Sequence, residues 1–166
     1  MNWTCGIDPG KSGGIALLTP TGEIIHTFKM PETEEDLAQT FRAMYSINNP
    51  VSVYCERIWS RPAQVDLKTG RPQRSGSNEG KFMMGYGVIR GILAALNFQR
   101  EYVTPQVWQK ALGCLTKGDK NISKDAAQRL WPRHKITHAI ADALLIAEYG
   151  RRKQLATEHL DPIDLL

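Results

Sequence analysis

In residues 5–16, Cys-Gly-Ile-Asp-Pro-Gly-Lys-Ser-Gly-Gly-Ile-Ala, an apolar run delivers one carboxylate, Asp8, into a turn rich in glycine and proline. Such a turn bends sharply and lets a ligand approach the backbone closely. A second apolar run follows this turn, and Pro20-Thr21-Gly22 marks the next turn. We therefore expect an antiparallel meander of three strands, over residues 3–8, 13–19 and 23–30.

The rest of the chain predicts a mixed α/β arrangement in one domain. Strands are expected over residues 51–56 and 101–104, and the first of these is apolar enough to be covered on both faces. Residues 57–80 are rich in glycine and proline without a steady period, which predicts a long loop, mobile until a ligand binds. Helices are expected from a Thr33 cap to Asn48, over 81–97, over 105–112, from a Ser123 cap to 130, and over 137–152. We expect one domain over residues 1–153 and a loose C-terminal tail over 154–166.

Size and composition limit the classes of protein to consider. The chain has 166 residues, of which 42% are hydrophobic, and this is enough for the core of a single domain. No apolar segment approaches the length of a membrane span, and the N-terminus lacks a secretion signal. The three cysteines, Cys5, Cys55 and Cys114, form no CxxC pair. Cys5 and Cys55 lie in apolar runs typical of strands, so we expect these two to be buried thiols in a reducing, cytoplasmic compartment. The lack of a segment long enough to span a membrane also predicts no membrane partner.

The charge is distributed unevenly along the chain. The net charge is only +4, with 21 basic and 17 acidic residues, but basic residues dominate two tracts, residues 57–81 and 105–135. Either tract alone is compatible with an ordinary solvated surface. Together they favour a polyanionic partner, and beside the acids described next they favour nucleic acid.

Three acids lie in apolar segments that are far apart in sequence. Asp8 ends the first strand, Glu56 ends the fourth, and Asp142 interrupts the apolar helix segment 138–147. If the strands of Asp8 and Glu56 are adjacent and parallel, both carboxylates emerge at one edge of the sheet. His138 precedes Asp142 by four residues and so shares its helix face. Buried carboxylates need a cation, so this pattern predicts a site for Mg²⁺ or Mn²⁺ rather than zinc.

Each of these residues also has a simpler interpretation. Asp8 is a common turn residue, Glu56 can pair with Arg57 at the surface, and His138 can bond to the backbone at the start of a helix. Asp142 is the hardest to explain in this way, because an unpaired carboxylate in an apolar helix is costly. The combination is far less expected by accident than any member alone. Two ions held by such a site can activate a water and stabilise the leaving oxygen in phosphodiester hydrolysis.

The chain resembles the RuvC family of Holliday-junction resolvases, of the ribonuclease-H-like superfamily, and especially its short phage-type or virus-type members. The resemblance covers nearly the whole chain, in the order of the family, through residues 6–10, the strand ending at Glu56, residues 87–91, residues 103–105 and residues 141–144. It implies an α/β ribonuclease-H-like fold with a central five-stranded mixed sheet flanked by helices, a homodimer, and Mg²⁺-dependent paired nicking of four-way DNA junctions. By this resemblance Asp8, Glu56 and Asp142 are the metal-binding acids.

The family's fourth metal residue often stands three positions before the last Asp. That position is Ala139 in this chain, and His138 lies on about the same helix face, so we expect His138 to serve as the fourth ligand. Lys110 and Lys124 lie where the family tends to keep lysines. We expect them to hold the scissile phosphate or stabilise its developing charge. Ordinary contacts to the phosphate backbone are an equal alternative.

Further residues are candidates for contact with DNA. Trp59 lies three residues past Glu56, where the family places an aromatic wedge, although it could simply cover the edge of the sheet. The basic candidates are Arg57, Arg61, Arg71, Arg74, Lys81, Lys117 and Lys120. The glycines in the helix over 81–97 indicate close packing, either on the chain's own sheet or across a dimer interface.

Several functions remain open on sequence alone. The first is resolution of four-way junctions, and a broader nuclease for forks and flaps is closely related to it. A ribonuclease H for RNA–DNA hybrids and a junction-binding protein without activity are the alternatives. A phosphotransferase of the actin-like class would need two such domains, and 166 residues are too few, so no nucleotide cofactor is expected. If a phage encodes the chain, its compartment is the host cytoplasm.

Overall fold

The computed structural model describes residues 1–46, 50–59, 76–116 and 118–158. Five strands form one mixed sheet in the order β3-β2-β1-β4-β5. Their bounds are β1 (Trp3–Asp8), β2 (Gly14–Leu18), β3 (Ile24–Lys29), β4 (Val51–Glu56) and β5 (Gln99–Val103). β1, β2 and β3 pair antiparallel, as the sequence predicts, while β4 pairs parallel with β1 and with β5.

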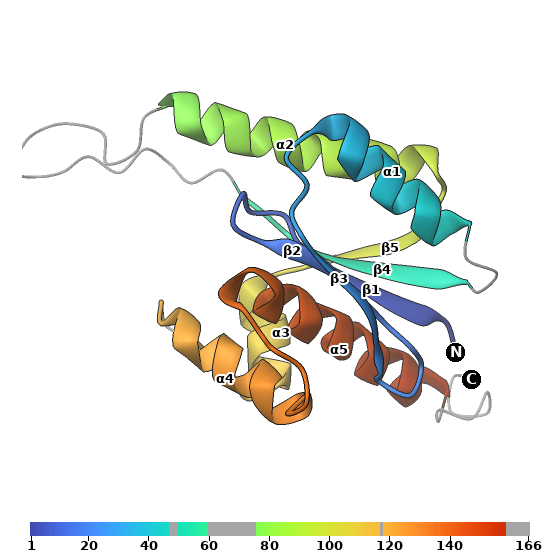
Figure 1. Ribbon diagram of the computed structural model, residues 1–166, viewed down its shortest axis with the longest axis vertical. Coiled ribbons are helices and arrows are strands. Elements are labelled where there is room, and N and C mark those ends of the chain that lie inside the picture. Colours follow the sequence, from blue (N-terminus) through green and yellow to red (C-terminus); the bar gives the residue numbers. More distant parts are fainter. Residues whose placement is uncertain (47–49, 60–75, 117, 159–166) are drawn as a thin grey trace, which may run out of the picture.

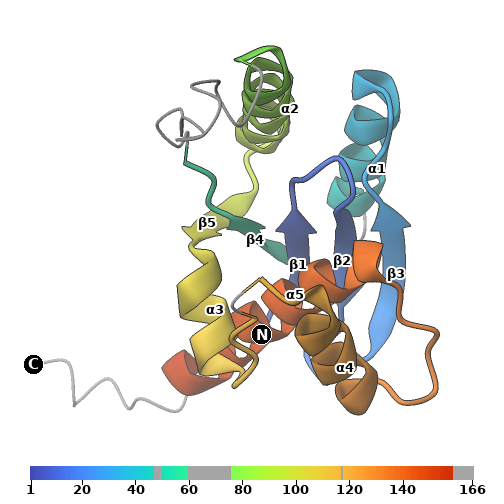
Figure 2. The same ribbon diagram turned by 90° about the vertical axis from the view of Figure 1, so that its left-hand side faces the viewer.

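Helices cover both faces of this sheet (Figures 1 and 2). One face carries α1 (Glu34–Tyr45) and α2 (Gly76–Ala95). The other carries α3 (Pro105–Ala111), α4 (Lys120–Leu130) and α5 (His138–Glu158). A separate apolar core fills each side of the sheet, which confirms the prediction of a mixed α/β domain with β4 covered on both faces.

Helix α5 lies unusually close to the sheet because glycines face it. A Cβ on Gly6 of β1 would collide with the backbone of Ala143 and Ala147, and a Cβ on Gly14 of β2 would lie 2.6 Å from the carbonyl oxygen of Ala139. Any side chain at these two positions would push the helix away. The glycines therefore fix the height of α5 above the sheet, and with it the position of Asp142.

Several element ends differ from the prediction. α2 begins at Gly76, inside the predicted loop, and β5 begins at Gln99, two residues early. α4 is capped by Asp119, whose side chain accepts a hydrogen bond from the backbone N–H of Asn121 at 2.9 Å, so the predicted Ser123 cap is wrong. α5 continues to Glu158, so residues 154–158 of the predicted tail are helical. Gln154 there donates to Thr4 Oγ1 at 3.2 Å, which ties this last part of the helix to β1.

All three cysteines are free and buried, as was predicted for Cys5 and Cys55. Burial raises the pKa of the Cys5 thiol to about 12, so this group is inert rather than nucleophilic. Among the residues that the structure describes, no helix is both long and apolar enough to span a membrane.

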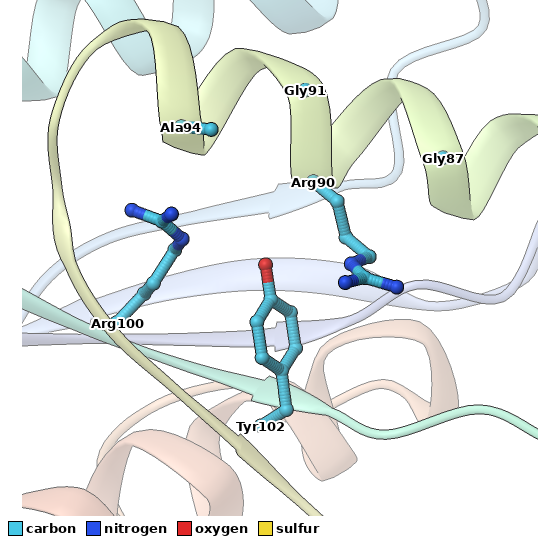
Figure 3. Close-up of a pocket in the computed structure, with 6 residues that line it drawn as sticks. All are labelled: Gly87, Arg90, Gly91, Ala94, Arg100 and Tyr102. Atoms are coloured by element: carbon cyan, nitrogen blue, oxygen red, sulfur yellow. The ribbon is translucent and has the colours of Figure 1, made fainter.

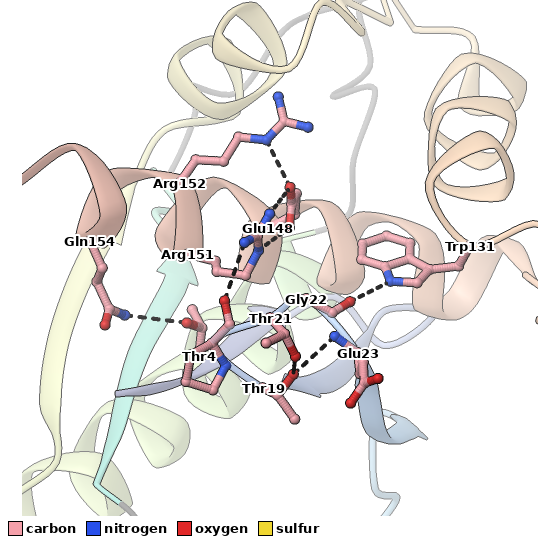
Figure 4. Close-up of polar contacts among 11 residues, drawn as sticks. Thr4, Thr19, Thr21, Gly22, Glu23, Trp131, Glu148, Arg151, Arg152 and Gln154 are labelled. Atoms are coloured by element: carbon pink, nitrogen blue, oxygen red, sulfur yellow. Dashed lines mark hydrogen bonds and ion pairs between the residues drawn. The ribbon is translucent and has the colours of Figure 1, made fainter. Parts of the chain in front are cut away.

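A buried carboxylate anchors the turn between β2 and β3 (Figure 4). Glu148 on α5 accepts hydrogen bonds from Arg151 at 2.7 and 2.9 Å and from Arg152 at 2.7 Å. Arg151 also donates to the carbonyl oxygen of Pro20 at 3.2 Å. Burial alone would raise the pKa of Glu148, but the hydrogen bonds from the two arginines outweigh burial and lower it.

Replacing Glu148 with glutamine is expected to destabilise the fold by about 3 kcal/mol, because a half-buried Arg151 would lose its charged partner. The melting temperature should fall by about 6–12 °C. The pKa of Glu148 is lowered in the fold, so the carboxylate adds to the free energy of unfolding when the pH is above the ordinary pKa of glutamate. This contribution is lost as the pH falls through the lowered pKa. The control is Lys153→Gln, which breaks an exposed pair with Glu101 and should cost less than about 1 kcal/mol. Equal losses in the two variants would contradict this account.

Candidate active site

Two of the candidate acids meet at one edge of the sheet. Ile7 of β1 pairs with Cys55 of β4 in a parallel register, so the next residues, Asp8 and Glu56, end neighbouring strands side by side. The sequence argument rested on this pairing, and the structure confirms it. The glycine-rich turn cradles the first carboxylate, because the backbone N–H of Gly10 donates to Asp8 Oδ1 at 3.1 Å.

The third acid, Asp142, reaches the same place from α5. Burial raises the pKa of Asp8, and the negative charge of Asp142 raises it further, whereas the Gly10 hydrogen bond lowers it. Burial likewise raises the pKa of Asp142 above its usual range. The three acids therefore repel one another in a partly dry site, and a cation would relieve that repulsion.

Glu56 has the most strongly shifted pKa of the three. Burial, and then the neighbouring charges of Asp8 and Asp142, raise its pKa to about 7. The indole of Trp108 on α3 opposes this shift, because its Nε1–H donates to Glu56 Oε2 at 3.1 Å. A carboxylate that is this reluctant to ionise marks a functional site more often than a structural one.

Trp108 is a site residue that the sequence analysis did not identify. Its side chain is fully buried, and its N–H has one partner in the described chain, the carboxylate of Glu56. A buried indole N–H needs an acceptor, so a tryptophan three residues after Pro105, beyond the end of a strand, was the available signal. The hydrogen bond engages Oε2 of Glu56 and not Oε1, and it holds the carboxylate in one orientation.

The basic side chains that lower the pKa of the acids come from α4 and α5. Lys120, the first residue of α4, lowers the pKa of both Asp8 and Asp142, and His138, the first residue of α5, lowers that of Asp142. His138 is thus close to Asp142, and its role as the fourth ligand stays a prediction. Lys120 was predicted only to contact DNA. Among the described residues, neither Lys110 nor Lys124 is among the charges that shift the pKa of the three acids.

Two buried oxygens at the site have no hydrogen-bond partner among the described residues. In the part of the chain that the structure describes, Asp142 Oδ1 and Ser123 Oγ make no hydrogen bond, although Ser123 lies near enough to lower the pKa of Asp142. The hydroxyl of Ser123 therefore lies close to the Asp142 carboxyl without a formed hydrogen bond to Oδ1. An orphaned buried carboxylate oxygen fits a cation ligand. The described His, Cys, Asp and Glu side chains do not come together in threes closely enough to enclose a metal ion as they stand.

Two of the candidate DNA-contact residues, Arg57 and Trp59, closely follow Glu56 in the chain. The guanidinium of Arg57 stacks over the ring of Trp59 at 4.1 Å, and the indole is 58% exposed, so it does not cover the edge of the sheet as a buried side chain would. Lys81 is exposed on α2. The remaining predicted contacts lie outside the described residues, namely Arg61, Arg71, Arg74 and Lys117.

The Trp108→Phe variant tests the role of the indole. Phenylalanine fills most of the space but cannot donate to Glu56, so we expect about a tenfold rise in the Mn²⁺ concentration that gives half-maximal binding by calorimetry. Trp131→Phe is the matched control, since it removes a similar Nε1 hydrogen bond of 2.8 Å to Gly22 O, in the β2–β3 turn. Indistinguishable Mn²⁺ titrations of the two variants would show that Trp108 only fills space.

Comparison with known proteins supports the fold. No protein-family model and no curated protein matches the chain. Among solved structures, RuvC from Thermus thermophilus superposes with a TM-score of 0.62 at 16% identity, covering 93% of this chain and 97% of that one. The same protein in complex with a Holliday-junction substrate gives 0.62 at 14% identity, covering 95% and 98%. The chain thus has the RuvC-like variety of the ribonuclease-H-like fold, as the sequence resemblance implies.

Proposed function

We propose that this chain is a divalent-metal-dependent endonuclease that resolves four-way DNA junctions by paired symmetric nicks. The observation that carries the proposal is the convergence of Asp8, Glu56 and Asp142, from three distant segments, at one edge of the sheet. The RuvC-like fold supports the assignment, since one of the superposed structures is bound to a Holliday junction. That the chain is a phage-type member stays a prediction.

The proposed ligands are Asp8, Glu56, His138 and Asp142, with Mg²⁺ as the ion and Mn²⁺ as its substitute. When bound, a pair of such ions would activate a water and stabilise the leaving oxygen in phosphodiester hydrolysis. The chain's own residues prepare the site. Gly10 fixes Asp8 through its N–H, and Trp108 fixes Glu56. Lys120 carries the positive charge that reaches two of the acids, so we propose that it helps to hold the scissile phosphate, with Lys110 and Lys124 as further candidates.

The stacked pair of Arg57 and Trp59 is the proposed contact with the junction. It directly follows Glu56 in the chain, and the indole is exposed. An exposed indole can stack on an unpaired base and contribute about 1–3 kcal/mol per base. The adjacent guanidinium can bind a phosphate, so this pair would hold distorted DNA next to the acids.

We also propose a homodimer that is formed through the outer face of α2. Along this face lie Gly80, Met84, Gly91 and Ala95, all of which are exposed. Nothing lies within 4 Å of where a Cβ would stand on Gly80 or Gly91, so these glycines do not serve packing on the chain's own sheet. The side chain of Met84 is 64% exposed. An open apolar face with small residues suits close approach of a second helix, and two-fold symmetry would present two active sites to the two strands.

The Met84→Glu variant tests this dimer. A carboxylate at the centre of an apolar helix contact would be desolvated without a partner, so light scattering should show the mass of one chain instead of two. The thermal stability of the monomer should change by less than about 1 kcal/mol, because the position is exposed in the single chain. Glu34→Gln, on the exposed start of α1, is the control and should leave the mass unchanged. A wild-type chain that is monomeric both alone and on DNA would contradict the proposal.

A panel of substrates tests the proposed function against its rivals. Labelled four-way junction, fork, flap, duplex and RNA–DNA hybrid are each incubated with the protein and Mg²⁺, and the rates are compared. We expect the junction to be cut fastest. Equal rates on forks and flaps would indicate a general nuclease for branched DNA, and preference for the hybrid would indicate a ribonuclease H. Release of phosphate from ATP without DNA cleavage would favour a phosphotransferase.

A further inference from the structure

A pocket lies between α2 and the edge strand β5 (Figure 3). Its volume is about 340 Å³, and its lining residues are Gly87, Arg90, Gly91, Ala94, Arg100 and Tyr102. Arg100 and Tyr102 alternate along β5 with Glu101 and Val103, so they point to the α2 side of the sheet. The pocket is thus separate from the carboxylates of the candidate active site, although Tyr102 pairs with Cys55, the residue before Glu56.

The guanidinium groups of Arg90 and Arg100 reach this pocket. Arg90 lies over the rings of Tyr86 and Tyr102, at 5.7 and 5.1 Å, and Arg100 donates to the carbonyl oxygen of Phe98 at 3.1 Å. Within the described ranges, neither arginine forms an ion pair with a carboxylate. The nearest acid in sequence, Glu101, points to the other side and is held by Lys153 at 2.7 Å.

The shape of the pocket leaves room for a ligand. Figure 3 shows the heads of the two arginines on either side of the Tyr102 hydroxyl, below α2. Gly87, Gly91 and Ala94 form the helix side of the pocket, and a Cβ on either glycine would meet nothing within 4 Å. Contact with two aromatic rings and with a carbonyl restricts the guanidinium groups before any ligand arrives, which lowers the entropic cost of binding.

We propose that this pocket binds one backbone phosphate of the DNA substrate, away from the cut; the inference rests on the proposed junction-resolving function. Guanidinium groups bind phosphate oxygens through paired, charge-assisted hydrogen bonds, and a tyrosine hydroxyl can donate a further one. Tyr102 of the pocket pairs with Cys55, the residue before Glu56. A DNA strand whose phosphate is bound in the pocket would therefore be held in a fixed position relative to the acids. This contact is independent of base sequence.

The experiment measures junction binding in Ca²⁺, with no Mg²⁺ or Mn²⁺ present, by fluorescence anisotropy from 50 to 300 mM salt. The variants are Arg90→Gln, Arg100→Gln and the double variant, and Arg42→Gln, on the exposed surface of α1, is the control. Each single variant should weaken binding about tenfold. Because both arginines serve one phosphate, the double variant should lose little more, and the slope of log affinity against log salt should decrease by about 0.9. Arg42→Gln should change affinity less than about twofold.

Several results would overturn the inference. Wild-type affinity and salt slope in the double variant would show that the pocket contacts no DNA, and additive losses with a slope change of about 1.8 would indicate two separate phosphates. A double variant that melts normally but has half the mass of the wild type would assign the pocket to contact between two copies. If the wild-type chain binds no DNA, the proposed function itself fails, and the inference fails with it; this outcome is distinct from loss in the variants alone.

Discussion

Asp142→Asn is expected to reduce cleavage of a four-way junction in Mg²⁺ by at least about a thousandfold, which corresponds to roughly 4 kcal/mol in the barrier. The substitution is nearly isosteric but removes the charge next to Asp8, and it places an amide where a buried carboxylate oxygen makes no hydrogen bond in the described chain. An amide group is a poor ligand for Mg²⁺ compared with a carboxylate. The loss should appear as product formation per enzyme under single-turnover conditions.

The variant should lose activity without losing its fold. Burial raises the pKa of Asp142, so a neutral side chain there removes a desolvation cost, and the melting temperature without metal should not fall. Junction binding in Ca²⁺ should stay within a few-fold of the wild type. Asp125→Asn, an exposed acid on α4, is the matched control and should cut at the wild-type rate. Retention of more than a tenth of the activity by Asp142→Asn would remove this residue from the proposed metal site.

Glu56→Gln is expected to raise the free energy of unfolding of the metal-free protein by about 3 kcal/mol at pH 8. The same substitution should abolish cleavage of DNA. The pKa of Glu56 is raised from 4.5 to about 7 in the fold, so the folded state favours the protonated form. The penalty for ionising it is absent below about pH 4.5, grows as the pH rises, and is complete above about pH 7. Glutamine is neutral at every pH and can still accept the hydrogen bond from Trp108.

Thermal melting in EDTA from pH 5 to pH 8 measures this effect. The variant should melt about 6–12 °C above the wild type at pH 8, and the difference should shrink towards pH 5. Adding Mg²⁺ should raise the melting temperature of the wild type more than that of the variant, because only the wild type gains a ligand for the charge. Glu35→Gln, an exposed acid on α1, is the control. If the difference in melting temperature between variant and wild type does not change with pH, the pKa of Glu56 is not raised by burial as described.

Periodicity and turn residues were enough to predict the five strands and the antiparallel meander, whereas the five-stranded mixed sheet was implied by the family resemblance. The apolar runs that end at Asp8 and Glu56 predicted two strands, and the parallel pairing of Ile7 with Cys55 confirms the geometry that the metal argument needed. Local sequence patterns predict strands because the side chains of a strand are either alternately buried and exposed or all buried. Asp142 was found in the same way, as a charge in an apolar helix.

Other parts of the site depend on packing that local sequence does not encode. Trp108 became a partner of Glu56 only because α3 folds back over the end of β4. Ser123 has the sequence character of a helix cap, but Asp119 begins the helix four residues earlier, and this turns Ser123 inward towards Asp142. For the same reason Lys120, at the true start of α4, lies nearer the acids than was predicted.

The most direct test of the central claim is to map the cuts in an immobile four-way DNA junction, with each strand labelled in turn, after incubation with the wild-type protein in Mg²⁺. We predict one nick in each of two opposite strands, at positions related by the symmetry of the junction, and none with Asp142→Asn. Tight binding of the junction without cleavage in either Mg²⁺ or Mn²⁺ would contradict the claim and would make the chain a junction-binding protein.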